Sequence, residues 1–164
     1  MPDPTPIAAP PPIAPQTPYF ADVFPFGMYN NARWQISQHQ FAAGVLLAQA
    51  AVEMGARHAF LLMLVRRHGP LSDEERDQLL PSSLSFLQDD CRALWCELTG
   101  RRVSRPKDPP VWTNYERHVH YRNAIAHGDT WGDSWGWQSV AAAGQFILRL
   151  DEHMAAVDRD APDR

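Results

Sequence analysis

The strongest pattern along the chain is helical: apolar side chains recur every three or four residues over 34–68. No proline interrupts this stretch, and the Gly69-Pro70 pair marks its end. The apolar series consists of Phe41, Val45, Ala48, Val52, Ala56, Phe60 and Met63. We therefore predict one long helix over 34–68.

Two further helices are predicted in the middle of the chain. Ser72 is followed by three acidic residues, an arrangement typical of a helix N-terminus, and this helix is expected to reach about residue 80. Pro81 restarts the chain into another helix, which ends at Gly100. The loop that follows, 101–110, carries four basic residues against one acid, so it suits either contact with phosphate or plain exposure to solvent.

The last third of the chain predicts two more helices and completes the fold class. One covers 111–127 and stops before Gly128. Thr130 and Asp133 are spaced like a capping box that opens the final helix. No stretch alternates as a strand would. The predicted fold is therefore all-α, an up-and-down bundle of four to five helices.

The ends of the chain differ in composition from this bundle. The first 25 residues contain nine prolines, and residues 1–33 are predicted to form an extended or disordered leader. The bundle then covers 34–158, and 159–164 form a disordered tail. The leader is expected to be passive, although a partner that recognises proline-rich segments is an alternative.

Composition and cysteine usage suit one cytoplasmic domain. The chain has 164 residues and a net charge of −4, which argues against a general nucleic-acid coat but not against a local basic site. Cys91 and Cys96 fit no zinc or redox spacing and are expected to be reduced thiols. Polar residues interrupt the most apolar stretch, 41–65, so no membrane span is predicted, and no signal peptide is visible.

The candidate chemistry lies in 115–129, at the end of a predicted helix. Asn123 and His127 are four residues apart and share a helix face, with His120 one turn earlier. Arg122 is five residues before His127, about 140° around the helix, so the two converge only near the helix end or against a partner. These residues also suit a structural role, because cations stabilise the last carbonyls of a helix.

An Arg, an amide and a His are sufficient to cleave RNA without a metal. The guanidinium suits a phosphate, and the imidazole exchanges a proton near neutrality. RNA supplies its own nucleophile, the 2′-hydroxyl, so the expected products are a 2′,3′-cyclic phosphate and a 5′-hydroxyl. DNA should be inert, and no metal or cofactor is expected.

The segment Arg122-Asn123-Ala124-Ile125-Ala126-His127-Gly128 resembles the R-x4-6-H motif of HEPN domains, in the form that begins Arg-Asn. The resemblance covers about residues 34–157. It implies a helical homodimer whose composite active site uses Arg122 and His127 as the catalytic pair, with Asn123 as their polar partner. Many HEPN domains are metal-independent ribonucleases of toxin–antitoxin or phage-defence systems, which implies an RNA substrate and a cognate antitoxin or regulatory protein. The alternative is a non-catalytic HEPN module that binds nucleotides or a partner protein.

Three residues are possible supports for this pair. His120 is expected either to assist His127 or to lie on the polar surface. His118 is expected to lie on the polar surface. Glu53 either forms an ion pair with Arg57 or lines the cleft and holds Arg122 or Arg57 in place.

Asp129 is the third supporting candidate, and it stands where some HEPN domains carry a Tyr that is a target for modification. Asp129 and Asp133 beside His127 hint at a metal, but no second ligand group supports one, so none is predicted. Arg33 and His39 also have the motif's spacing, but they precede the long predicted helix, which is the wrong setting for the family.

Overall fold

The computed structural model describes residues 12–14, 24–128 and 133–160, and it confirms the all-α class. Six helices and no strand occur within those ranges. In chain order they are α2 (Phe24–Ser37), α3 (Phe41–His68), α4 (Asp73–Leu79), α5 (Asp89–Thr99), α6 (Pro109–Ala126) and α7 (Asp133–Asp160).

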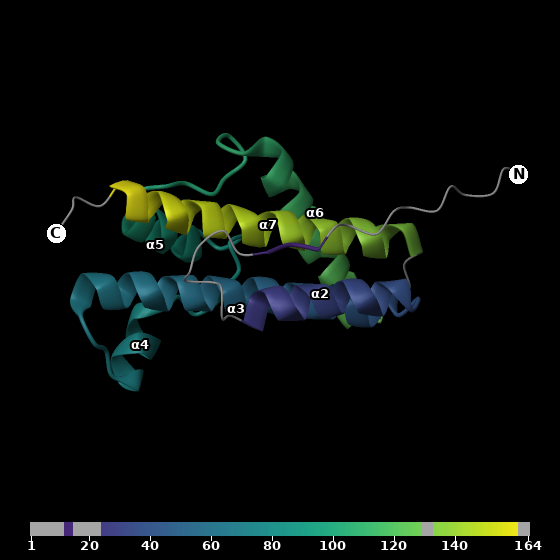
Figure 1. Cartoon of the computed structure of the whole chain (residues 1–164), viewed down its shortest axis with the longest axis horizontal. Coiled ribbons are helices and arrows are strands. Elements are labelled where there is room, and N and C mark those ends of the chain that lie inside the picture. Colours follow the sequence, from purple (N-terminus) through teal and green to yellow (C-terminus); the bar gives the residue numbers. More distant parts are fainter. Residues whose placement is uncertain (1–11, 15–23, 129–132, 161–164) are drawn as a thin grey trace, which may run out of the picture.

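The four longest helices, α2, α3, α6 and α7, alternate in direction and form the bundle (Figure 1). Side chains paired across α6 and α7 show that these two run antiparallel: His118 lies against Ser139, and Asn114 bonds Gln145. The last residues of α2 and α6 and the first residues of α3 and α7 lie at the same end of the bundle (Figure 1). The shorter α4 and α5 are inserted between α3 and α6.

An aromatic cluster fills the centre of the core. The edge of the Trp95 ring meets Phe60 at a centroid distance of 5.4 Å, and Phe86 packs against Phe146 at 5.2 Å. Tyr115 stacks on Phe146 from the side of α6, at 3.9 Å. All five side chains are fully buried. Such aromatic pairs stabilise the fold by more than the area they bury accounts for. The cluster joins α3, α5, α6 and α7 into one core.

The prediction of one helix over 34–68 is wrong, because the chain turns between α2 and α3. The Gln40 N–H donates to the Gln35 carbonyl at 2.9 Å, and the His39 N–H donates to Ile36 at 2.9 Å, which is the Schellman pattern of a helix end. His39 takes the left-handed position, with φ of 60°. Glycine usually takes that position, so the residues here carry no recognisable stop signal.

The boundary of the leader also moves. Helix α2 begins at Phe24, so residues 24–33, predicted to be extended or disordered, belong to the bundle. Phe26 and Tyr29 are buried, and Ile13 packs against the core from further upstream. Pro25 lies in the first turn of α2, where its missing N–H costs nothing. The proline-rich composition therefore hid a helix start.

The helix predicted from Pro81 begins only at Asp89. The irregular chain before it places the buried Phe86 ring between those of Phe60 and Phe146. Helix α5 ends at Gly100 as predicted, and that glycine has φ of 68°. The core therefore takes Phe86 from a loop, an arrangement that helical periodicity cannot reveal.

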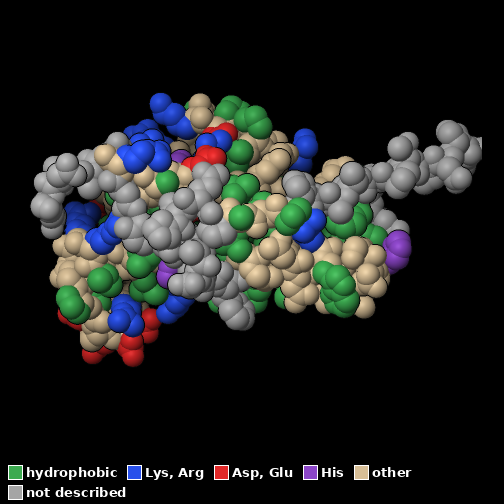
Figure 2. Space-filling view, in the orientation of Figure 1, with side chains coloured by type: hydrophobic (Ala, Val, Ile, Leu, Met, Phe, Trp, Pro, Cys, Tyr) green, Lys and Arg blue, Asp and Glu red, His purple; other side chains and the backbone are tan. Residues whose placement is uncertain are grey.

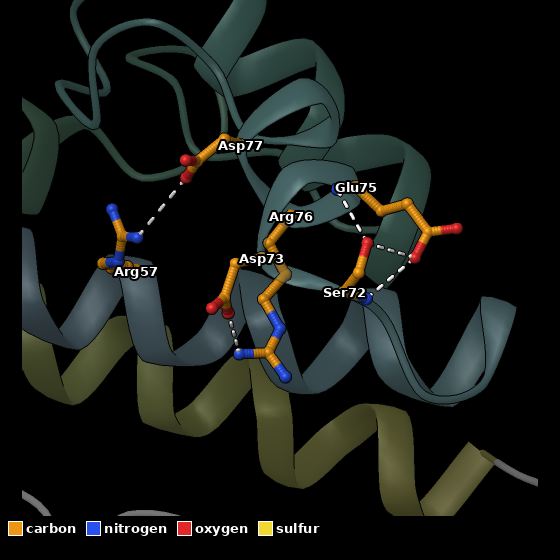
Figure 3. Close-up of polar contacts among 6 residues, drawn as sticks. All are labelled: Arg57, Ser72, Asp73, Glu75, Arg76 and Asp77. Atoms are coloured by element: carbon orange, nitrogen blue, oxygen red, sulfur yellow. Dashed lines mark hydrogen bonds and ion pairs between the residues drawn. The ribbon is translucent and has the colours of Figure 1, made fainter.

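The predicted start of α4 is confirmed as a capping box (Figure 3). The Glu75 N–H donates to the Ser72 hydroxyl at 3.3 Å, and the Ser72 N–H donates to the Glu75 carboxylate at 2.8 Å. Arg57 of α3 lies 3.8 Å from Asp77, which links the two helices (Figure 3). No residue of α4 is buried, so its ends are stabilised locally.

Helix α3 is long and apolar enough, by length and composition, to cross a membrane, with a mean hydropathy of 1.2 in its best 18-residue window. This test uses length and composition only, so the expectation that no segment spans a membrane stays a prediction. Half of that window is buried inside the molecule, where α3 contacts α2, α5, α6 and α7. A core helix of this kind passes the same test.

Candidate functional site

The candidate site lies where α6 ends. The helix begins with two prolines, Pro109 and Pro110, in its first turn and runs to Ala126. His127 caps it, with its N–H directed at the carbonyls of Asn123 and Ala124 at 3.0 and 3.1 Å. Gly128 follows with φ of 89°, a left-handed conformation that favours glycine. The local sequence thus fixes the backbone of the motif.

The side chain of His127 is exposed and makes no hydrogen bond or ion pair with the described residues. Its imidazole is free to reach a ligand from the helix terminus. Its ordinary roles as proton donor and acceptor are therefore available to a ligand.

Arg122 and Asn123 contact each other directly. The Arg122 Nη1 donates to the Asn123 Oδ1 at 2.9 Å, and Asn123 is itself exposed. Among the described residues Arg122 has no carboxylate partner within ion-pair distance. The guanidinium is therefore held by an amide that leaves its charge uncompensated, and it keeps donors for an anion.

His118 is not a surface residue, which corrects the expectation for it. It is fully buried, and its Nδ1 lies 2.7 Å from the Ser139 hydroxyl of α7. Burial lowers the pKa of His118 to about 4, and the nearby Arg122 cation acts in the same direction. His118 therefore ties the last turns of α6 to α7 and does not face a ligand.

The three supporting candidates have different positions. His120 is exposed, with its ring 6.1 Å from that of Tyr121, which in turn lies 5.1 Å from the exposed Trp135 ring. Glu53 accepts a hydrogen bond from Gln49 at 2.7 Å. Asp129 lies outside the described residues.

The two roles expected for Glu53 are therefore not observed. Arg57 pairs with Asp77 rather than with Glu53. Glu53 is close enough to Tyr115 to influence its pKa, and Tyr115 lies two helical turns before Arg122. Among the described residues Glu53 bonds Gln49 and holds neither Arg122 nor Arg57.

Arg33 and His39 occupy a setting more like the motif than the sequence indicates. Arg33 lies on α2, and His39 lies in the exposed turn after that helix. Both residues still precede the long helix α3, the position for which they were discounted. The pair lacks an Asn next to the Arg, since Arg33 is followed by Trp34.

A second polar feature lies at the opposite end of α6, and sequence reasoning missed half of it. A cleft of about 550 Å³ is formed between the loop after α5 and the second half of α7. We call it the basic cleft; its lining residues are Gly100, Arg101, Arg102, Lys107, Asp108, Arg149 and His153. The loop residues were candidates for phosphate contact, but no sequence pattern brings Arg149 and His153 to them.

Metal coordination has little support in the part of the chain that the structure describes. No group of three or more His, Cys, Asp or Glu side chains there is close enough to hold an ion. Cys91 is buried, Cys96 is partly exposed, and both are free thiols.

Comparison of the chain with models of protein families, with curated proteins and with solved structures gives no match. What the site can do is therefore decided by its own residues. A cation held by an amide and an exposed imidazole can together hold a phosphate and exchange a proton.

Proposed function

We propose that this protein is a metal-independent endoribonuclease of the HEPN type. The observation that carries the proposal is the last turn of α6, where Arg122 bonds Asn123 and the exposed His127 caps the helix. Neither side chain has a carboxylate partner among the described residues. A half-buried cation and an exposed imidazole near one helix terminus suit an RNA phosphate.

The reaction needs only the substrate and these groups. The 2′-oxygen of the ribose attacks phosphorus while an imidazole takes its proton, and the bond from phosphorus to the 5′-oxygen breaks. The departing 5′-oxygen receives a proton, which leaves a 2′,3′-cyclic phosphate and a 5′-hydroxyl. Arg122 stabilises the charge on the phosphoryl oxygens. DNA has no 2′-hydroxyl and stays intact.

One imidazole cannot be both base and acid in the same step. A second copy of the motif would supply the other, so we propose a homodimer whose composite site joins the two copies of Arg122 and His127. A nuclease of this kind has to be restrained in the cytoplasm that produces it. A toxin or phage-defence role, controlled by an antitoxin or regulatory protein, suits that requirement.

The test compares two matched histidines. His127→Asn and His39→Asn each replace an exposed His at the end of a helix that carries an Arg five or six residues earlier. In EDTA, the unchanged protein and His39→Asn should cleave RNA, and His127→Asn should lose about two to four orders of magnitude in rate. The products should carry cyclic phosphate ends.

Two results would overturn parts of the proposal. Equal cleavage by His127→Asn would remove the catalytic role of this residue. An active protein that sediments as a monomer would remove the composite site. A dimer that leaves diverse RNAs whole but binds nucleotides or a partner protein would instead favour the non-catalytic alternative.

A further inference from the structure

The basic cleft is separate from the proposed nuclease site. Asp108 precedes the first turn of α6 and His127 follows its last, so the two sites are roughly 28 Å apart along the helix. Four cationic side chains line the cleft against one carboxylate, in a chain whose net charge is −4. Figure 2 shows Lys and Arg side chains gathered at the upper left, over the loop after α5 and the second half of α7.

Arg149 is the fixed part of this cleft. Its Nε contacts the Asp108 carboxylate, and its Nη1 donates to Glu152 at 2.6 Å. These two acids orient the guanidinium and compensate its charge. The exposed Arg102 and Lys107, in contrast, form no ion pair with a described residue. The unbalanced positive charge of the cleft therefore lies on these loop residues.

His153 adds a neutral donor to the cleft wall. The Trp95 indole N–H can only donate, and it lies 3.0 Å from the His153 Nδ1, which must then accept. Burial lowers the pKa of His153 to about 4. The cations Arg149 and Arg101 lower it further, whereas the Asp108 carboxylate acts in the opposite direction. The ring is neutral near pH 7, and its proton is therefore on Nε2.

We propose that the basic cleft binds a small ligand that carries two or more phosphate groups, of nucleotide size. Its exposed cations Arg102 and Lys107, the oriented guanidinium of Arg149 and the Nε2–H of His153 are donors suited to phosphate oxygens. Its volume of about 550 Å³ exceeds the size of one phosphate and lies in the range of small-molecule sites. Gly100 at the rim has no side chain to restrict entry. The proposal does not depend on the nuclease activity.

The test is calorimetric titration of the full chain with phosphate, pyrophosphate, AMP, ADP and ATP, at two salt concentrations. We expect saturable binding of pyrophosphate, ADP and ATP, and at least tenfold weaker binding of phosphate. Arg102→Gln and Lys107→Gln, which alter exposed residues, should each weaken ADP binding on the order of tenfold.

Arg105→Gln is the matched control. Arg105 belongs to the same loop and carries the same charge, but it contacts Glu116 outside the cleft. ADP binding should be unchanged in this variant and in His127→Asn. No saturable binding of any probe overturns the proposal, as does equal weakening by Arg105→Gln and Arg102→Gln. A 5′-phosphorylated oligoribonucleotide that binds where ADP does not would overturn the small-ligand assignment.

Discussion

The Nδ1 of His118 lies 2.7 Å from the hydroxyl oxygen of Ser139, and this pair joins α6 to α7 inside the core. Both side chains are buried. His118 is four residues before Arg122 and therefore one turn below it on the same face. The pair holds the segment of α6 that presents the proposed catalytic residues.

The burial of His118 makes the stability of the fold depend on pH. The pKa of His118 is lowered from 6.5 to about 4 in the folded chain, and the unfolded chain keeps the higher value. As the pH falls from 6.5 towards 4, the unfolded state gains a proton that the folded state does not bind. The free energy of unfolding should therefore be highest above pH 6.5, and His118 alone should lower it by about 3 kcal/mol over this window. Denaturant titrations at several pH values measure it.

His118→Asn separates this contribution from that of the carboxyl groups. The amide replaces the Nδ1 of the ring beside Ser139 but does not titrate. We expect a less stable variant whose unfolding free energy changes less steeply between pH 6.5 and pH 4. His153, with a pKa also lowered to about 4, retains its own share of the slope. An unchanged slope would show that His118 is not the group that titrates.

Two glycines in helices should respond in opposite ways to alanine. A Cβ at Gly144 would lie 2.5 Å from the Cζ of the buried Tyr29, which has no room to move. That clash costs about 1–3 kcal/mol, more than the gain in helix propensity of about 1 kcal/mol. A Cβ added at Gly27 would have no other atom within 4 Å. Thermal unfolding should show Gly144→Ala destabilised and Gly27→Ala stabilised; stabilisation of both would contradict the close α2–α7 contact.

The sequence predicted those elements whose ends carry chemical markers. The capping residues of α4 and the glycines after α5 and α6 placed these ends to within a few residues. The break at His39 was missed because a histidine holds the left-handed position that glycine usually takes. The start at Phe24 was missed because prolines surround it.

Of the candidate site, too, only part could be predicted from the sequence. Arg122, Asn123 and His127 are close in sequence, so helical geometry alone could place them at one terminus. The burial of His118 depends on α7, and the basic cleft depends on Arg149 and His153 meeting a loop some 40 residues earlier. Such long-range pairings leave no periodic signal in one sequence.

The two cysteines should differ in reactivity. Burial raises the pKa of Cys91 to about 12, with a further contribution from Asp90, so almost no thiolate forms near neutral pH. Cys96 is partly exposed. An aromatic disulfide reagent should modify one thiol of the native protein and both in denaturant. Cys96→Ser should remove the native reaction; rapid labelling of Cys91 in that variant would contradict its burial.

The turn between α2 and α3 offers a test of backbone strain. His39 has φ of 60°, which costs a residue with a side chain about 1 kcal/mol relative to glycine. His39→Gly removes this cost, whereas His39→Ala keeps it. Both variants lose the contact between the His39 and Phe41 rings, whose centroids are 5.9 Å apart. The glycine variant should therefore be more stable than the alanine variant by about 1 kcal/mol in denaturant unfolding. Equal stability of the two variants would mean that residue 39 is not left-handed in solution and that α2 and α3 are joined in another way.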